Sequence, residues 1–222
     1  MALRHSPLAI ETILFDLDGT LVDSANETRT ILNEMRDDRA LGPLEDSLFR
    51  PLISYGAGSL IKSALNPRDE DVQPLIDAFR AKYSTLKTPA SSIYPSVVET
   101  LSALQKRGFK LGVCTNKPQN LCANVLRDTA LEVFFECVVA GGPEIKPKPH
   151  HEPVQLAISG LRADASTTVL IGDSTTDQRA AQSAGIAFIF YASGYNDGVV
   201  EDQALACIDT ISELLDLDLF KI

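Results

Sequence analysis

An alternation of helical and strand-like segments in the second half of the chain limits the possible folds more than any other sequence feature. Between residues 96 and 191, apolar residues change repeatedly from helical spacing to short continuous runs. Parallel strands joined by right-handed helical crossovers produce this order of elements. The sequence therefore predicts a doubly wound parallel sheet. Helices are expected over 96–107, 119–128, 153–159, 176–184 and 211–217, and strands over 109–115, 135–140, 168–172, 186–191 and 205–208.

An apolar run at 13–15 predicts one more strand, and charged residues follow it directly. Asp16 and Asp18 lie one residue apart, and Gly19 allows a sharp turn just beyond them. Short continuous apolar runs are typical of strands buried in parallel sheets, and open α/β sheets bind ligands at the carboxyl ends of such strands. The two acids are therefore candidate functional residues, although an isolated Asp-x-Asp-Gly sequence is equally typical of a solvated turn.

The segment that follows contains helical patterns but no convincing strand. Apolar residues recur at helical spacing over 25–36, 48–65 and 71–86. Asp23 and Ser24 are candidate N-cap residues for the first of these helices. The prolines and serines near residue 92 then mark a linker back to the alternating region.

Together these regions predict an α/β protein with an inserted domain. We expect a doubly wound, Rossmann-like parallel-sheet core at 1–22 and 93–222, and an all-helical cap domain at 23–92. Hinge residues are expected at 23–24 and 94–95, where the chain passes between the two parts.

The charge and cysteine content limit the choice of partner and compartment. A net charge of −10 opposes binding to nucleic acid or to an anionic membrane, because both require a basic surface. No stretch approaches the ~18 apolar residues of a membrane span, and residues 1–12 lack the apolar region of a signal peptide. Four widely spaced cysteines are typical of free thiols in a reducing compartment. We therefore expect a cytoplasmic protein that binds neither nucleic acid nor membrane.

Polar residues also follow two later strands. Thr115 and Asn116 end strand 109–115 just before a helix, whose N-terminal N–H groups suit phosphate oxygens. Asp173 and Asp177 follow strand 168–172, and their spacing of four places them on one face if a helix begins directly after Asp173. The simpler explanation for the first pair is an ordinary helix cap.

A proline-stiffened loop at 144–153 adds basic residues to this set. It carries Lys146 and Lys148, one of which could reach the strand ends as a fixed cation. A solvated basic loop explains either lysine taken singly. The order of all four motifs along the chain is much more specific than any one of them.

This order resembles that of the haloacid dehalogenase superfamily of phosphohydrolases, over the whole chain. DLDGT at 16–20 matches the first motif, TN at 115–116 the second, Lys148 in KPHHEP the third and GDSTTD at 172–177 the fourth. DLDGTLVDS and TNKP are typical of the phosphoglycolate phosphatase-like subgroup, which carries a helical cap between the first two motifs. His151 departs from the proline that is common there, and as a loop residue it is expected to have little effect.

The resemblance implies a catalytic role for each motif. Asp16 would attack phosphorus and form an aspartyl-phosphate, and Asp18 would protonate the leaving alcohol and later deprotonate water. Thr115, Asn116 and Lys148 would bind the phosphate. Superfamily dehalogenases lack the second acid, so that Asp18 argues against carbon–halogen cleavage.

The resemblance also implies Mg²⁺ as cofactor. Its ligands would be Asp16, the main-chain carbonyl of Asp18, and Asp173, with Asp177 supporting indirectly. Four carboxylates against Lys148 alone would repel a phosphate dianion, and a divalent cation offsets that repulsion.

Substrate choice is expected to depend on the cap. Arg50, Tyr55 and Lys62 are candidates to contact the non-phosphate end of a substrate, Arg50 by binding an anionic group such as a carboxylate. Solvated or packing side chains are the simpler explanation for each. His5, His150 and His151 are expected to be surface or loop residues rather than ligands.

The sequence thus predicts a Mg²⁺-dependent phosphatase that acts on a small phosphorylated metabolite, with phosphoglycolate as the favoured substrate and a monomer or homodimer as the assembly. A β-phosphoglucomutase-like phosphosugar mutase, a pyrophosphatase or a nucleotidase would use the same core. A catalytically silent binding or regulatory protein is the alternative from another class, and the retention of every acid together with Lys148 counts against it.

Overall fold

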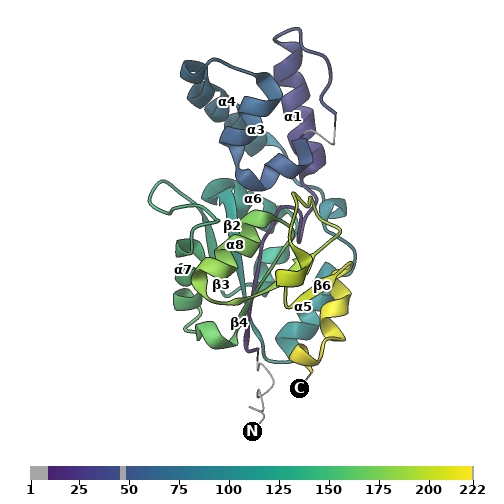
Figure 1. Ribbon diagram of the computed structural model, residues 1–222. Coiled ribbons are helices and arrows are strands. Elements are labelled where there is room, and N and C mark those ends of the chain that lie inside the picture. The colour runs from purple at the N-terminus through teal and green to yellow at the C-terminus, as the bar shows by residue number, and fades with distance from the viewer. Residues whose placement is uncertain (1–9, 46–48, 222) are drawn as a thin grey trace.

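The computed structural model describes residues 10–45 and 49–221, so that the predictions for His5 and for the start of the 48–65 helix lie outside the described residues. Figure 1 shows a sheet flanked by helices, with a separate group of helices stacked at one end of it.

Six parallel strands form a single sheet in the order β3-β2-β1-β4-β5-β6. The strand order reverses between β1 and β4, and this reversal creates the crevice in which doubly wound sheets bind ligands. The predicted fold class is therefore confirmed. The strands are β1 Thr12–Phe15, β2 Lys110–Pro118, β3 Cys137–Gly141, β4 Thr168–Gly172, β5 Ala187–Tyr191 and β6 Ala206–Ile208.

Helices cover both faces of this sheet because successive strand residues point to opposite sides. Ile13 and Phe15 of β1 belong to one apolar cluster, whereas Leu14 between them belongs to another. The first cluster includes residues of α5 and α6, and the second includes residues of α7 and α8. The helices are α5 Val97–Lys106, α6 Gln119–Asp128, α7 Glu152–Gly160 and α8 Thr175–Ala184.

The helices between β1 and α5 pack on one another and are called the cap below. They lie beyond the carboxyl ends of the strands, and α4 also contacts α6 of the core. Gly56 separates η1 from α3 with a positive φ of 86°. The limits of 23–92 for a cap domain stay a prediction. The cap elements are α1 Ala25–Asp37, η1 Arg50–Tyr55, α3 Ala57–Leu65, η2 Asp69–Asp71 and α4 Val72–Thr85.

The two chain crossings between core and cap lie side by side. The N–H of Asp23 donates to the carbonyl of Ser92 at 2.7 Å, and the N–H of Tyr94 donates to the carbonyl of Leu21 at 3.1 Å. These backbone hydrogen bonds hold both predicted hinge segments in one short two-stranded connection.

Two predicted elements differ from the observed ones. The helix expected over 211–217 is a shorter 3₁₀ helix, Ile211–Leu215. Strand β2 continues to Pro118, so that Asn116 lies within the strand rather than after it, and Thr115 is not its last residue. The pairing with β3 shifts register between Cys114 and Pro118. The remaining 3₁₀ helices are η3 Ala90–Ser92, η4 Leu131–Phe134, η5 Ala165–Thr167, η6 Glu201–Gln203 and η8 Asp218–Phe220.

Within the described ranges, every helix is too short or too polar to cross a bilayer. All four cysteines are free: Cys114 and Cys122 are buried, Cys137 is half-buried and Cys207 is exposed.

Candidate active site

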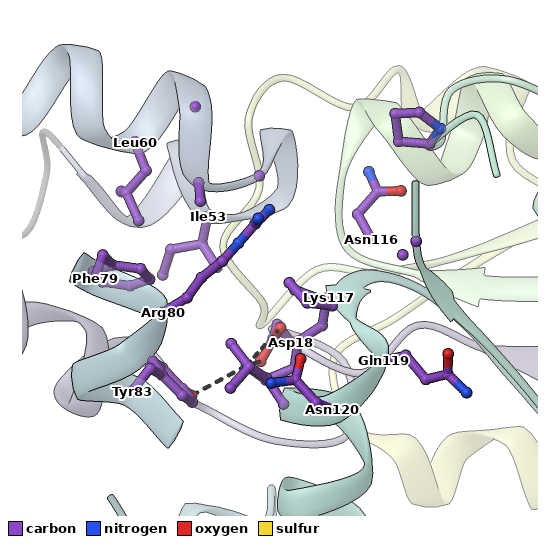
Figure 2. Close-up of a pocket in the computed structure, with 18 of the residues that line it drawn as sticks. Asp18, Ile53, Leu60, Phe79, Arg80, Tyr83, Asn116, Lys117, Gln119 and Asn120 are labelled. Carbon is purple, nitrogen blue, oxygen red and sulfur yellow. Dashed lines mark hydrogen bonds and ion pairs between the residues drawn. The ribbon is translucent and has the colours of Figure 1, made fainter. Parts of the chain in front are cut away.

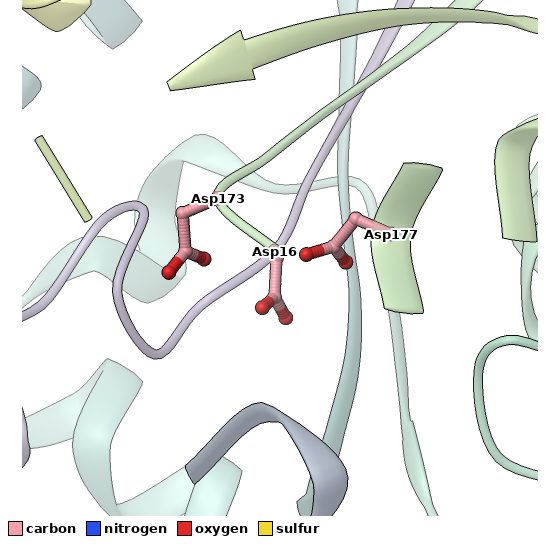
Figure 3. Close-up of side chains that lie close together, drawn as sticks. All are labelled: Asp16, Asp173 and Asp177. Carbon is pink, nitrogen blue, oxygen red and sulfur yellow. The ribbon is translucent and has the colours of Figure 1, made fainter. Parts of the chain in front are cut away.

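Three acids converge at the point where the strand order reverses. Asp16 follows β1, Asp173 follows the neighbouring β4, and Asp177 lies in the first turn of α8. Each offers a carboxylate oxygen within 4.8 Å of the others, and Figure 3 shows the three side chains gathered around one space. Two oxygens on opposite sides of one Mg²⁺ lie about 4.2 Å apart at its usual bond length. The predicted convergence of strand ends is therefore confirmed for these acids.

Glycines allow the backbone to pass this close to the carboxylates. Gly19 has a φ of 87°, as its predicted role in a sharp turn requires, and a Cβ there would overlap the Asp173 carboxylate. A Cβ at Gly172 would overlap the side chain of Asp177. Each of these glycines therefore fixes the distance between one acid and its neighbouring loop.

Hydrogen bonds orient Asp173 and Asp177. Asp173 accepts from the Thr20 hydroxyl at 3.0 Å and from the backbone N–H of Tyr195 at 2.7 Å. Asp177 forms a capping box with Ser174, whose hydroxyl donates to Asp177 Oδ2 at 2.5 Å. Tyr195 was not predicted from the sequence, because it lies on a loop far from every motif.

Lys148 is the lysine of the 144–153 loop that reaches these acids, while Lys146 remains exposed. Its Nζ lies 2.9 Å from Asp16 Oδ1, and it donates to Asp177 Oδ1 at 2.5 Å and to the Cys114 carbonyl at 2.8 Å. Burial opposes its charge, but the two carboxylates raise the pKa of Lys148 above its usual value. The lysine is thus a fixed cation beside Asp16.

The three acids together offer more negative charge than Lys148 alone can balance. Burial raises the pKa of Asp16 to about 6, although Lys148 acts in the opposite direction. Burial, together with the nearby Asp177 and Asp16, raises the pKa of Asp173 well above its usual value. Asp16 Oδ1 is buried, and its neighbour is the ammonium group of Lys148 at 2.9 Å. This donor set fits a hard divalent cation, which would ionise and neutralise the cluster. We call Asp16, Asp173, Asp177 and Lys148 the acid site.

The second predicted motif lies next to Lys148. Thr115 is buried, and its Oγ1 accepts the backbone N–H of Lys117 at 3.2 Å. Asn116 holds the backbone of Lys148 from both sides: Oδ1 accepts its N–H at 2.8 Å and Nδ2 donates to its carbonyl at 3.0 Å. The observed contacts of Asn116 position the lysine loop, and its predicted contact with phosphate stays a prediction.

Asp18 has a separate set of partners, which includes the cap. Lys117 Nζ donates to both of its carboxylate oxygens, at 3.0 and 3.1 Å, and the Ser24 hydroxyl donates at 2.5 Å. The same ammonium group donates to the Tyr83 hydroxyl on α4 at 3.1 Å. We call Asp18, Ser24, Lys117 and Tyr83 the Asp18 cluster.

Two features of this cluster were not predicted. The Ser24 hydroxyl binds Asp18 instead of capping α1, and Asp23 Oδ1 accepts the N–H of Ala25 instead. Lys117 is nearly buried, although lysine at a strand end is usually solvated. Its position two residues after Thr115 on β2 was the available signal, because alternate strand residues share a face.

The three cap residues that were predicted to contact the substrate have different partners. Arg50 forms an ion pair with Asp23 at 3.0 Å and stacks over the Tyr195 ring. Lys62 pairs with Asp69 in solvent, away from the strand ends. Tyr55 lies within 3.1 Å of the Thr175 hydroxyl at the start of α8. Arg50 is thus engaged at the hinge, and its predicted contact with a substrate anion has no support in its present partners.

A cavity of about 920 Å³ lies between the cap and the start of α6, and Asp18 is one of the residues that line it. Figure 2 shows α4 on one side of it and the segment from Asn116 to Asn120 on the other. Its polar or charged lining residues are Asp18, Ser24, Thr28, Tyr55, Arg80, Tyr83, Asn116, Lys117, Gln119 and Asn120.

The two histidines that the structure describes, His150 and His151, belong to neither cluster. His150 and His151 stack on each other in the Lys148 loop with ring centroids 4.1 Å apart, and both are half-buried. Both lie in the loop, as predicted.

Comparisons with known proteins agree with this geometry. The profile of a family described as haloacid dehalogenase-like hydrolase matches residues 13–191. The phosphoglycolate phosphatase of Caulobacter vibrioides is 37% identical over 195 residues, which cover 86% of this chain and 82% of that relative.

Solved structures share the fold. The crystal structure of a predicted phosphoglycolate phosphatase from Haemophilus somnus 129pt has a TM-score of 0.84 and 26% identity, covering 94% of this chain and 97% of that one. β-Phosphoglucomutase from Clostridium difficile has a TM-score of 0.75 at 18% identity, covering 92% and 93%, and at this identity it supports the fold alone. With most of its length matched by the family profile and by a relative above 30% identity, this chain belongs to the haloacid dehalogenase-like hydrolases and is phosphoglycolate phosphatase-like in sequence.

Proposed function

We propose that this hydrolase is a Mg²⁺-dependent phosphatase of small phosphomonoesters, with phosphoglycolate as its preferred substrate. The observation that carries the proposal is the convergence of Asp16, Asp173 and Asp177 around one space, with Lys148 as the fixed cation beside them. Relatives named phosphoglycolate phosphatase support the choice of substrate.

Asp16, the Asp18 carbonyl and Asp173 would hold the metal ion, and Asp177 would support them through its contact with Lys148. A bound Mg²⁺ would neutralise part of the negative charge of both the acids and the phosphoryl group. Lys148 would contact the phosphoryl oxygens beside Asp16, and Thr115 would donate its hydroxyl to them. Phosphoryl transfer depends mainly on this kind of positioning and charge stabilisation.

Asp16 would act as the nucleophile. Its carboxylate oxygen forms a bond to phosphorus while the bond from phosphorus to the ester oxygen breaks, and the electron pair leaves with that oxygen. Asp18 gives its proton to the leaving oxygen. In the second step Asp18 takes a proton from water, the water oxygen attacks phosphorus, and the bond to Asp16 breaks to release phosphate.

Phosphate release from p-nitrophenyl phosphate and phosphoglycolate tests the proposal. We expect turnover that EDTA abolishes and added Mg²⁺ restores, and that is lost in Asp16→Asn. Asp69→Asn is the matched control, because Asp69 is exposed and pairs only with the solvated Lys62. Turnover that survives both EDTA and Asp16→Asn would contradict the mechanism.

The same assay separates the alternatives. A mutase would isomerise a phosphosugar faster than it releases phosphate. The isomerised phosphosugar and the free phosphate are therefore both measured. A protein with no turnover of any ester in Mg²⁺ would instead support the binding or regulatory hypothesis.

A further inference from the structure

The cavity described above begins where the leaving alcohol must lie. Asp18 is the acid that meets this oxygen in the proposed mechanism. It lines the cavity, whereas the four residues of the acid site do not. The phosphoryl half of a substrate occupies the acid site, and its alcohol half therefore extends into the space between α4 and α6.

This space is positive in a chain that is strongly negative overall. Its lining residues include the cations Arg80 and Lys117 but a single acid, Asp18. Lys117 is committed, because it already pairs with Asp18 and Tyr83. Arg80 forms no hydrogen bond or ion pair with any of the residues that the structure describes.

Arg80 projects toward the cavity from α4, as Figure 2 shows. It lies three residues, about one helical turn, before Tyr83, and neighbours at this spacing share a helix face. Tyr83 contacts Lys117, which contacts Asp18, and Arg80 therefore stands one turn further along the same wall.

The opposite wall adds hydrogen-bond donors. Helix α6 begins at Gln119 without a side-chain cap, and its first residues Gln119 and Asn120 line the cavity. Uncapped first-turn N–H groups and the helix dipole favour an anion at this end. Both walls thus suit the same kind of ligand.

We propose that Arg80 is the specificity-determining residue that recognises a second anionic group, a carboxylate or a phosphate, on the alcohol half of the substrate. This inference rests on the proposed phosphatase function for the placement of the alcohol. Arg50 was predicted to bind such an anionic group, but it forms an ion pair with Asp23. The proposal therefore assigns this role to Arg80 instead.

Four two-carbon phosphomonoesters that differ at the far end test the proposal. Phosphoglycolate carries a carboxylate, ethylene glycol bisphosphate a phosphate, 2-hydroxyethyl phosphate a neutral hydroxyl and phosphoethanolamine a cation. For each protein, the kcat/KM for the better anionic ester is divided by the kcat/KM for 2-hydroxyethyl phosphate. We expect this ratio to be at least tenfold lower in Arg80→Gln than in the wild type. Arg80→Lys should retain part of the ratio, and Arg80→Glu should shift preference toward phosphoethanolamine.

Lys82→Gln is the matched control. Lys82 lies on the same helix, pairs with Glu34 in solvent and does not line the cavity, so that its removal should leave the ratio unchanged. A ratio in Arg80→Gln within twofold of wild type for both anionic esters would overturn the proposal. The better of the two anionic esters identifies the second group.

Binding keeps this inference separate from the proposed function. Calorimetry can measure the affinity of Asp16→Asn for phosphoglycolate, ethylene glycol bisphosphate and 2-hydroxyethyl phosphate. This measurement does not depend on turnover. A preference for an anionic ester that Arg80→Gln removes would support Arg80 even if the wild-type protein hydrolyses none of these esters. Equal affinities for all three, or no binding, would overturn it.

Discussion

The acid site and the Asp18 cluster lie next to each other but are built from different parts of the molecule. The four side chains of the acid site all come from the core: Asp16 follows β1, Asp173 follows β4, Asp177 lies on α8 and Lys148 lies in the loop between β3 and α7. The Asp18 cluster includes Tyr83 of the cap and Ser24 at the hinge. We therefore expect the side chains of Asp16, Asp173 and Asp177 to keep their geometry when the cap moves, whereas the environment of Asp18, the proposed acid–base, depends on where the cap lies.

The largest effect should come from removing the cation of the acid site. Lys148→Met leaves buried carboxylates without their fixed partner, which costs roughly 3–5 kcal/mol of unfolding free energy. Urea unfolding measures this loss, and phosphate release should fall below detection. Lys146→Met is the control in the same loop and should change neither, because Lys146 is exposed. A wild-type unfolding midpoint for Lys148→Met would show that the acid site is not held as described.

A large loss of rate is also expected from Asp18→Asn. Without proton transfer to the leaving oxygen, kcat should fall by ~10²–10⁴-fold for phosphoglycolate. The fall should be much smaller for p-nitrophenyl phosphate, whose leaving group needs no proton. Steady-state kinetics on both esters check this, and equal losses would argue that Asp18 acts on structure rather than on the leaving group.

Metal removal should affect the acid site with a smaller change in stability. A ligand of the native state at 100 times its dissociation constant stabilises by about 2.7 kcal/mol. Mg²⁺ should therefore raise the thermal midpoint of the wild-type protein, and Asp173→Asn should abolish this rise. A Mg²⁺-dependent rise that persists in Asp173→Asn would place the metal elsewhere.

The smallest effect should come from the cap side of the Asp18 cluster. Tyr83→Phe removes one hydrogen bond to Lys117 but keeps the ring beside it, at a cost of about 0.5–1.5 kcal/mol in unfolding free energy. Tyr55→Phe is the control, because its hydroxyl contacts the core at a more exposed position. If Tyr55→Phe lowers the unfolding free energy as much as Tyr83→Phe, the Tyr83 hydroxyl has no special stabilising role in the Asp18 cluster.

Several elements of the fold were predictable because their signals are local. The run at 168–172 is a strand at the predicted residues, and the helix over 119–128 has its predicted ends. Gly108 and Gly185 lie just after helices and have φ of 86° and 71°, a left-handed conformation that glycine adopts without strain, so that these helix ends are also local signals. The end of β2 was not predictable, because its extension through Lys117 depends on pairing with β3 after a register shift.

Local sequence patterns could not predict which groups the cationic side chains contact. Arg50 and Arg80 are both cap arginines, yet one is paired at the hinge and the other faces the cavity. Lys117 and Lys148 both reach buried acids, but only Lys148 lies in a motif that indicates its role. Which charge meets which depends on how the cap packs against the core, and apolar periodicity carries no information about that arrangement.

The sequence by itself determined the alternating sheet and the acids at its strand ends, since apolar period, glycine position and motif order are properties of short segments. Only the tertiary structure decided that Lys117 binds Asp18, that Tyr83 binds Lys117 and that Arg80 lines the same cavity as Asp18. Those contacts join residues distant in the chain, and their geometry exists only once the cap helices lie against α6.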